Sequence, residues 1–261
     1  MEMKGRKAIL VVSFGTSFTK TRKETIHVIE QRIADAFPDR KIYYAWTSQM
    51  LLKKVREREG LEIDHVSQAL ERMKRDGIRE VIVQPTHLLD GIENERMKAD
   101  VECMREAFER IRVGRPLLAK PEDEQEITEI LCKVWKEIPK EELLVLMGHG
   151  SSHSANAVYG RLADKLPECG NKNIILGTVE AQPSLDTVLT KALDRHPDRV
   201  HLAPFMIVAG DHAINDMAGE EEDSWMSRFR QAGFETVCHL RGLGEYKEVQ
   251  EMFLRHVREA V

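Results

Sequence analysis

The stretch LLVLMGHGSS, residues 143–152, decides the fold class, because an apolar run there ends abruptly in glycine, histidine and glycine. A short continuous apolar run bounded by turn residues is typical of a buried strand in a parallel sheet. Further apolar runs follow the same pattern at residues 8–13, 42–47, 80–84, 173–178, 200–205 and 236–240. The segments between them have helical periodicity, as in the face formed by Ile26, Ile29 and Ile33. This alternation predicts an α/β fold with mostly parallel sheets and helices on both faces.

The run at residues 143–152 also has a counterpart in the first half of the chain. Three pairs of stretches match in the same order: LVVSFGTS (Leu10–Ser17) with VLMGHGSS (Val145–Ser152), IYYAWTS (Ile42–Ser48) with IILGTVE (Ile174–Glu180), and QPTHLLDGIEN (Gln84–Asn94) with APFMIVAGDHA (Ala203–Ala213). The third pair aligns proline on proline and glycine on glycine without a gap, and it places Glu93 opposite His212. The matches predict a duplicated α/β unit.

The crossing between the two copies is expected near residues 113–126, where two prolines and a cluster of charges interrupt the pattern. We therefore expect an N-terminal half at residues 1–125 and a C-terminal half at residues 126–261. Each half should have three layers, α/β/α, around a parallel sheet.

Composition narrows the class of protein. Of the 261 residues, 42% are hydrophobic and 32% charged, which is typical of a globular chain. The net charge of −5 argues against nucleic acid as a partner, and no run reaches the ~20 apolar residues that span a bilayer. The four cysteines lie far apart and form no CxxC pair, so we expect neither a zinc ribbon nor a disulfide framework. These features predict a reduced, cytoplasmic protein.

Polar side chains follow three of the expected strands in the second half. His149 follows the first strand, Glu180 the second and His212 the third. Because ligands bind beyond the carboxyl ends of parallel strands, we expect these side chains to meet at one edge of the sheet. Two imidazoles and a carboxylate can hold a divalent transition metal and leave a coordination position open.

Each of these residues also has a plain structural interpretation. His149 could be an ordinary turn residue. Glu180 could be an ordinary charge near a helix start, where a carboxylate interacts favourably with the helix dipole. Asp211 is expected to be the N-cap of the helix that follows. The shared position of His149, Glu180 and His212 favours a site over three separate accidents. The chain lacks GxGxxG, a Walker lysine and HExxH, so no nucleotide site is expected.

Four stretches together resemble a known family: LVVSFGTS, MGHGSSH, GTVEAQP and APFMIVAGDHAINDMAGEEEDSW. They are similar to the ATP-independent sirohydrochlorin cobaltochelatases of anaerobic cobalamin biosynthesis, which are related in fold to ferrochelatase. The resemblance extends over essentially the whole chain. It implies two similar α/β halves with a tetrapyrrole held in the cleft between them.

The resemblance also implies roles for particular residues. His149, Glu180 and His212 would ligate the metal, with His149 also a catalytic base. Glu93 would be a catalytic acid of the cleft, although Asp90 and Ile92 beside it depart from the form expected in the family. The substrate metal would be cobalt(II), with iron(II) or nickel(II) as alternatives. The tetrapyrrole would be sirohydrochlorin or precorrin-2. The chain could also form a homo-oligomer.

Three other functions fit the same residues. A related chelatase could insert iron(II) for sirohaem or haem, since the ligand set does not separate the metals. A non-catalytic carrier could bind metal or tetrapyrrole without joining them. An α/β hydrolase could use a metal-bound water and need no tetrapyrrole.

Overall fold

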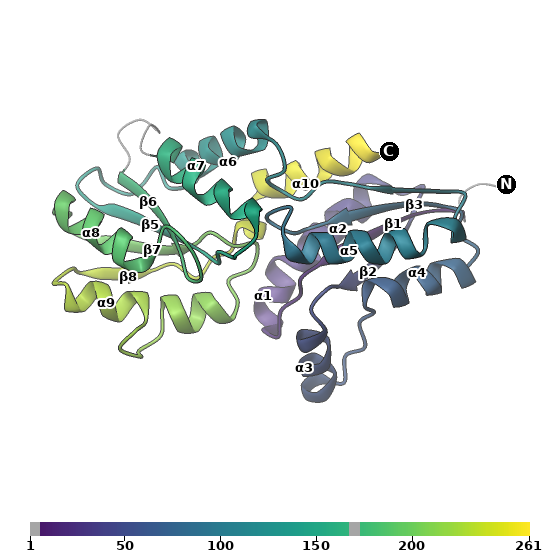
Figure 1. Cartoon of the computed structure of the whole chain (residues 1–261), viewed down its shortest axis with the longest axis horizontal. Helices are drawn as coiled ribbons and strands as arrows, with labels where there is room; N and C mark the ends of the chain where they lie inside the picture. Colours follow the sequence, from purple (N-terminus) through teal and green to yellow (C-terminus); the bar gives the residue numbers. More distant parts are fainter. Residues whose placement is uncertain (1–5, 167–172) are drawn as a thin grey trace. The chain divides into compact units, whose positions relative to one another are not determined.

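The computed structural model describes residues 6–166 and 173–261, and these fold into two compact units (Figure 1). The first unit contains the chain up to Ala119 together with Gly244–Val261, and the second contains Lys120–Leu243. Within the described residues, each unit has one four-stranded parallel sheet. The predicted α/β class with two similar halves is confirmed.

In the first unit the strands lie in the order β2-β1-β3-β4. Their bounds are β1 (Lys7–Ser13), β2 (Lys41–Trp46), β3 (Glu80–Pro85) and β4 (Arg110–Val113). The central strand β1 pairs with β2 and β3, so that Val12 lies beside Ala45 on one side and Pro85 on the other.

The second unit repeats this order as β6-β5-β7-β8. Its strands are β5 (Leu143–Gly148), β6 (Asn173–Thr178), β7 (Val200–Pro204) and β8 (Thr236–Cys238). Met147 lies beside Gly177 and Pro204. These residues are the aligned counterparts of Val12, Ala45 and Pro85, so the three sequence matches correspond to one shared register.

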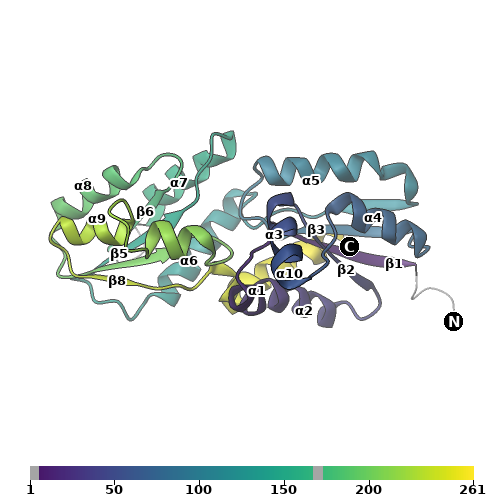
Figure 2. The ribbon, with the colours of Figure 1, turned by 90° about the horizontal axis from the view of Figure 1, so that it is seen from below.

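Helices cover both faces of each sheet because alternate strand residues point to opposite faces. In the first unit, Ala8, Leu10 and Val12 pack against α4 (Val66–Arg75) and α5 (Ile92–Cys103), the two helices drawn along one face of the sheet in Figure 2. In the second, Leu143, Val145 and Met147 pack against α8 (Leu185–Arg195) and α9 (Trp225–Gln231). The helices of the first unit are α1 (Thr19–Glu24), α2 (Ile26–Ala36), α3 (Gln49–Glu59), α4 (Val66–Arg75), α5 (Ile92–Cys103) and α10 (Lys247–Ala260). Those of the second are α6 (Pro121–Val134), α7 (Ala157–Lys165), α8 (Leu185–Arg195) and α9 (Trp225–Gln231).

The second unit begins at a well-defined helix start. Pro121 is the first residue of α6, where its missing N–H costs nothing, and three acidic residues in the first turn suit the positive end of the helix dipole. One of them, Glu124, is buried and accepts hydrogen bonds from Arg161 (2.6 Å) and Lys165 (3.2 Å) of α7. These charged contacts tie α6 to α7 on one face of the sheet.

The C-terminal helix α10 does not follow the expected boundary between the halves. It lies at the end of the chain but belongs to the first unit, where it packs against α2 and β3. Its buried face includes Val249, Met252 and Phe253, and Arg32 of α2 donates a 2.8 Å hydrogen bond to Gln250. The compact units therefore differ from the expected division at residues 125 and 126, because burying this apolar face outweighs sequence proximity.

Two further expectations differ from the structure. The first is the edge strand β4, which the sequence did not predict. The second is Cys132, which is disulfide-bonded, so the expectation of reduced cysteines is wrong at this residue. Cys103 and Cys238 are free. Among the residues described, none of the helices is long and apolar enough to cross a bilayer.

Candidate metal centre

His149 is held in a turn that directly follows β5. A Cβ at Gly148 would lie 2.3 Å from the ring of Tyr159, and one at Gly150 would lie 2.9 Å from the backbone nitrogen of Ala181. Gly150 also has φ +81°, which glycine adopts without strain. Both glycines are therefore required by close packing, which brings the backbone of the turn against its neighbours.

Tyr159 of α7 packs against this turn. Its side chain is buried, and burial raises the pKa of its phenol to about 12, although hydrogen bonds with the backbone of Gly150 and His149 oppose the shift. Its ring also packs edge-on against Phe205, with centroids 6.2 Å apart. Tyr159 therefore links the turn that holds His149 to the residue just after β7.

Glu180 lies beside His149 because the pairing of β5 and β6 continues past the ends of both strands. Val179 N donates to Gly148 O at 3.0 Å, and Glu180 N donates to His149 O at 2.8 Å. The Glu180 side chain is half-exposed, with 54% of its surface accessible. The backbone thus sets the spacing of the two groups, while the carboxylate stays open to solvent.

His212 comes from the segment after β7. It precedes a π-helical turn at Ala213–Met217, in which Ala218 N donates to Ala213 O at 3.2 Å. Ala213 and Met217 are fully buried and anchor this turn in the core. Single π-helical turns are rare and often lie at functional sites.

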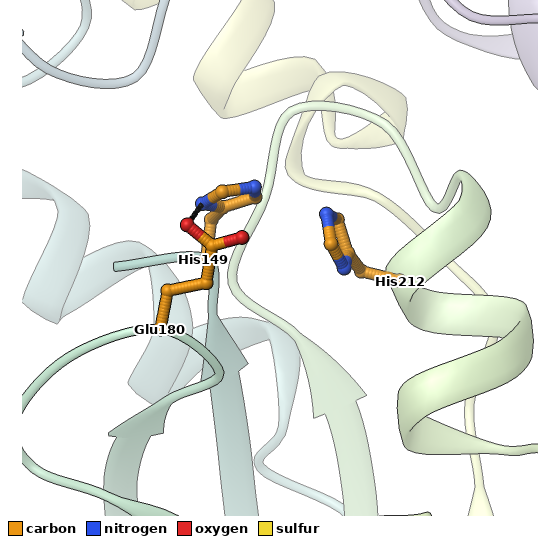
Figure 3. A group of neighbouring side chains, drawn as sticks. All are labelled: His149, Glu180 and His212. Atoms are coloured by element: carbon orange, nitrogen blue, oxygen red, sulfur yellow. Dashed lines mark ion pairs between the residues drawn. The ribbon is translucent and has the colours of Figure 1, made fainter. Parts of the chain in front are cut away.

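The three side chains converge at the carboxyl edge of the second sheet (Figure 3). One potential ligand atom from each of His149, Glu180 and His212 lies within 4.8 Å of the others. The two imidazole rings are nearly perpendicular, with centroids 4.4 Å apart. The edge predicted from sequence is therefore where the three groups meet.

Hydrogen-bond acceptors decide which ring nitrogen each histidine offers. His149 Nδ1 lies 2.7 Å from Gly150 O, and His212 Nδ1 is hydrogen-bonded to a carboxylate oxygen of Asp216. A carbonyl or an ionised carboxylate only accepts, so each Nδ1 carries the proton and each Nε2 keeps its lone pair. Glu180 is 3.7 Å from His149 Nδ1, too far to compete for that hydrogen bond. Both Nε2 atoms are then available as metal ligands.

The donor set suits a transition metal held for transfer. Imidazole nitrogen and carboxylate oxygen bind such ions, and three protein ligands leave a further position for water or substrate. The side chains of His149, Glu180 and His212 are 44%, 54% and 34% exposed, so the group is accessible. A closed structural site would hide its ion, whereas this group is open to solvent.

Glu93 lies in the other unit and is not part of this group. It occupies the first turn of α5, directly after the Gly91 N-cap, and its carboxylate accepts a 2.7 Å hydrogen bond from Arg96. The aligned residue of the second unit is His212, which also lies at a helix start beyond the third strand. The structure therefore places Glu93 at the corresponding sheet edge of the first unit.

Asp211 differs from its expected role. The hydrogen bond from Ile214 N to Gly210 O starts the helix one residue earlier, so Asp211 is exposed in the first turn and Gly210 occupies the capping position. The carboxylate that interacts with the site is instead Asp216, which the sequence interpretation missed. The sequence feature that could have revealed this contact is the spacing of four residues between His212 and Asp216, which places the two side chains on one helical face.

Comparison with known proteins places the chain among chelatases. The family "Cobalt chelatase (CbiK)" matches residues 7–261. The sirohydrochlorin cobaltochelatase of Salmonella typhimurium is 38% identical over 256 residues, covering 98% of this chain and 97% of that protein. The sirohydrochlorin cobaltochelatase CbiKC of Nitratidesulfovibrio vulgaris is 31% identical, covering 98% of this chain and 91% of that protein.

Solved structures show the same fold at lower sequence identity. SirB from Bacillus subtilis with Fe3+ aligns with a TM-score of 0.68 at 17% identity, covering 98% of this chain and 95% of SirB. CbiX, described as the terminal enzyme of sirohaem biosynthesis in denitrifying bacteria, aligns with a TM-score of 0.60 at 17% identity, covering 98% of this chain and 100% of CbiX. At these identities the likeness concerns the fold alone.

Proposed function

The chain belongs to the cobalt chelatase (CbiK) family, and on that premise we propose that it inserts cobalt(II) into sirohydrochlorin through His149, Glu180 and His212. It is an enzyme, a metal chelatase of the lyase class. The observation that carries the assignment of the site is the convergence of the three ligand atoms within 4.8 Å at one sheet edge.

Metal capture would use the two Nε2 lone pairs and the Glu180 carboxylate. The carboxylate lowers the local potential and so favours a divalent cation. Three protein ligands leave at least one coordination position of the ion for water or substrate. The tetrapyrrole can therefore bind the ion before the protein releases it. Gly150 O holds the ring of His149 through Nδ1, so its Nε2 remains directed away from the turn.

Insertion exchanges one metal ion for two pyrrole N–H protons, so the site must accept protons as the ion leaves. An imidazole nitrogen that releases the metal regains a free lone pair and can accept a proton near neutral pH. We assign this step to His149. Glu93 is proposed as a second acid–base group, supported by its place at the corresponding sheet edge and by its partly exposed side chain.

The choice of metal belongs to the same proposal. Cobalt(II) is favoured by the family, while iron(II) and nickel(II) suit the same ligands, because selectivity depends on geometry and supply. No nucleotide is required, since the exchange of a metal ion for protons proceeds without a phosphoryl donor.

An anaerobic absorbance assay tests this function. Purified protein is mixed with sirohydrochlorin and cobalt(II), iron(II) or nickel(II), and the metallated spectrum is followed against a protein-free blank. The parent is expected to exceed the blank with cobalt(II), and His212→Ala and Glu180→Ala are expected to lose most of that excess. Glu222→Gln, which removes an exposed charge outside the site, serves as the control.

Two results would contradict the proposal. A parent rate equal to the blank with every metal would favour a carrier. Parent-like rates in both ligand variants would keep the chelatase and reject the site.

A further inference from the structure

Asp216 is the feature of this region that the proposed chemistry leaves without a role. It is one of the residues in the π-helical turn at Ala213–Met217, and its carboxylate is hydrogen-bonded to His212 Nδ1. No metal ligand set requires it, since the three converging atoms come from other residues. From this contact we propose that Asp216 is a positioning residue that orients His212 for cobalt(II) capture, an inference that rests on the proposed metal site.

The local backbone is built to bring these two residues together. Side chains four residues apart on a helix lie on one face, which places Asp216 beside His212, and the turn between them is π-helical. The turn is held by the buried side chains of Ala213 and Met217. It closes at Gly219, where a Cβ would lie 2.2 Å from the carbonyl oxygen of Asn215 and where Gly219 N donates to that oxygen at 3.0 Å. A side chain at 219 would therefore disturb the turn that presents Asp216.

The contact determines both the orientation and the electronic character of His212. With Nδ1–H donated to Asp216, Nε2 is the nitrogen left to face the ion. A carboxylate partner also makes a ligating imidazole more basic, and losing such a partner typically costs 10–100-fold in metal affinity. A partly exposed acid on a helix is ordinarily a solvated charge, but here the acid contacts a ring that lies 4.4 Å from a second imidazole.

The two histidines are therefore held differently. His149 donates to a neutral carbonyl, that of Gly150, whereas His212 donates to a charged carboxylate. A carboxylate partner stabilises positive charge on the ring and its metal better than a carbonyl does. His212 with Asp216 is accordingly the stronger anchor for the ion.

The inference is tested with cobalt(II) alone, without tetrapyrrole. Cobalt(II) is titrated into the metal-free full chain by calorimetry and by its visible ligand-field absorption. Asp216→Ala is expected to weaken binding by about 10–100-fold. Asp216→Asn should lose less, because an amide oxygen still accepts from Nδ1–H while the charge is gone. Glu222→Gln removes an exposed charge that takes no part in the contact and is expected to bind like the parent.

A steady-state measurement separates positioning from general damage. In the chelatase assay, Asp216→Ala should raise the KM for cobalt(II) and leave the KM for sirohydrochlorin unchanged. A circular-dichroism melt confirms that each variant is folded, and Asp216→Asn keeps the test valid should Asp216→Ala unfold.

The outcomes distinguish the inference from the site it rests on. Weaker cobalt(II) binding in His212→Ala but parent-like binding in both Asp216 variants would overturn the role of Asp216 and leave the metal site standing. Equal binding by the parent and His212→Ala would overturn the site and the inference together.

Discussion

His87 follows β3 in the first unit and is enclosed by polar side chains. It is buried, with Nε2 3.4 Å from Thr47 Oγ1 and Nδ1 3.4 Å from Asn94 Oδ1. Burial lowers the pKa of its imidazole to about 4, although the hydrogen bond with Asn94 and the charges of Glu93 and Asp90 oppose the shift. The ring is therefore neutral at pH 7.

This lowered pKa predicts a loss of stability in mild acid. Below pH 6.5 the unfolded chain gains a proton that the folded protein does not accept until about pH 4. The free energy of unfolding should fall as the pH drops from 6.5 towards 4, at up to about 1.4 kcal/mol per pH unit from this group. In His87→Gln that part of the slope should vanish between pH 6.5 and 5, as measured by urea unfolding at each pH.

The control is His196→Asn, at an exposed left-handed position that asparagine tolerates. It should keep the parental slope. An unchanged slope in His87→Gln would contradict the assignment of a buried neutral imidazole.

At the residue scale, sequence predicted that His149, Glu180 and His212 lie close together, but not the contact of His212 with Asp216. His149, Glu180 and His212 each follow a strand, and strand ends meet at one edge, so their proximity follows from the pattern. Asp216 was missed because an aspartate within a helix is ordinarily a solvated charge. Its spacing from His212 places the two side chains on one helical face, but the hydrogen bond between them is seen only in the structure.

Among the elements, the turn between β5 and α7 is the one whose glycines matter most. A Cβ at Gly150 meets the backbone nitrogen of Ala181 at 2.9 Å, and its φ of +81° is unfavourable for alanine. Gly150→Ala is therefore expected to lower the free energy of unfolding by about 1–3 kcal/mol. It should also weaken cobalt(II) binding, because the strain acts on the turn that carries His149.

Gly160 offers the matched control within the same region. It lies inside α7, and a Cβ there meets nothing within 4 Å. Gly160→Ala should raise the free energy of unfolding by about 0.5–1 kcal/mol, because alanine loses less entropy in a helix. Thermal melts and cobalt(II) titration of both variants provide the comparison. Equal effects of the two substitutions would contradict the packing described for the turn.

Elements with continuous apolar runs were predictable, and the short edge strand was not. Arg110–Val113 reads RIRV, so its apolar residues alternate with arginines and form no apolar run. Ile111 packs into the core that also includes Val83, while strand alternation places the arginines on either side of it on the opposite face. These four residues form a strand because they pair with β3. A local pattern of four residues is too short to predict that pairing.

Over the whole molecule, duplication was predictable because three stretches repeat in order, whereas the placement of α10 was not. An amphipathic helix shows in its sequence that one face is buried, but not which sheet covers it. The duplication also shows how the halves have diverged. The positions of His149, Glu180 and His212 are occupied in the first unit by Phe14, Ser48 and Glu93. The first unit therefore has the same strand order and register but only one carboxylate at these three positions.

Diffraction at the cobalt absorption edge, from crystals of the full chain grown with cobalt(II), tests the central claim most directly. We predict one ion bound about 2.0–2.2 Å from Nε2 of both histidines and from a Glu180 oxygen. The corresponding edge of the first unit, at Phe14, Ser48 and Glu93, should hold none. An ion at that edge instead, or one bound through Nδ1 of His212 with Asp216 displaced, would contradict the account.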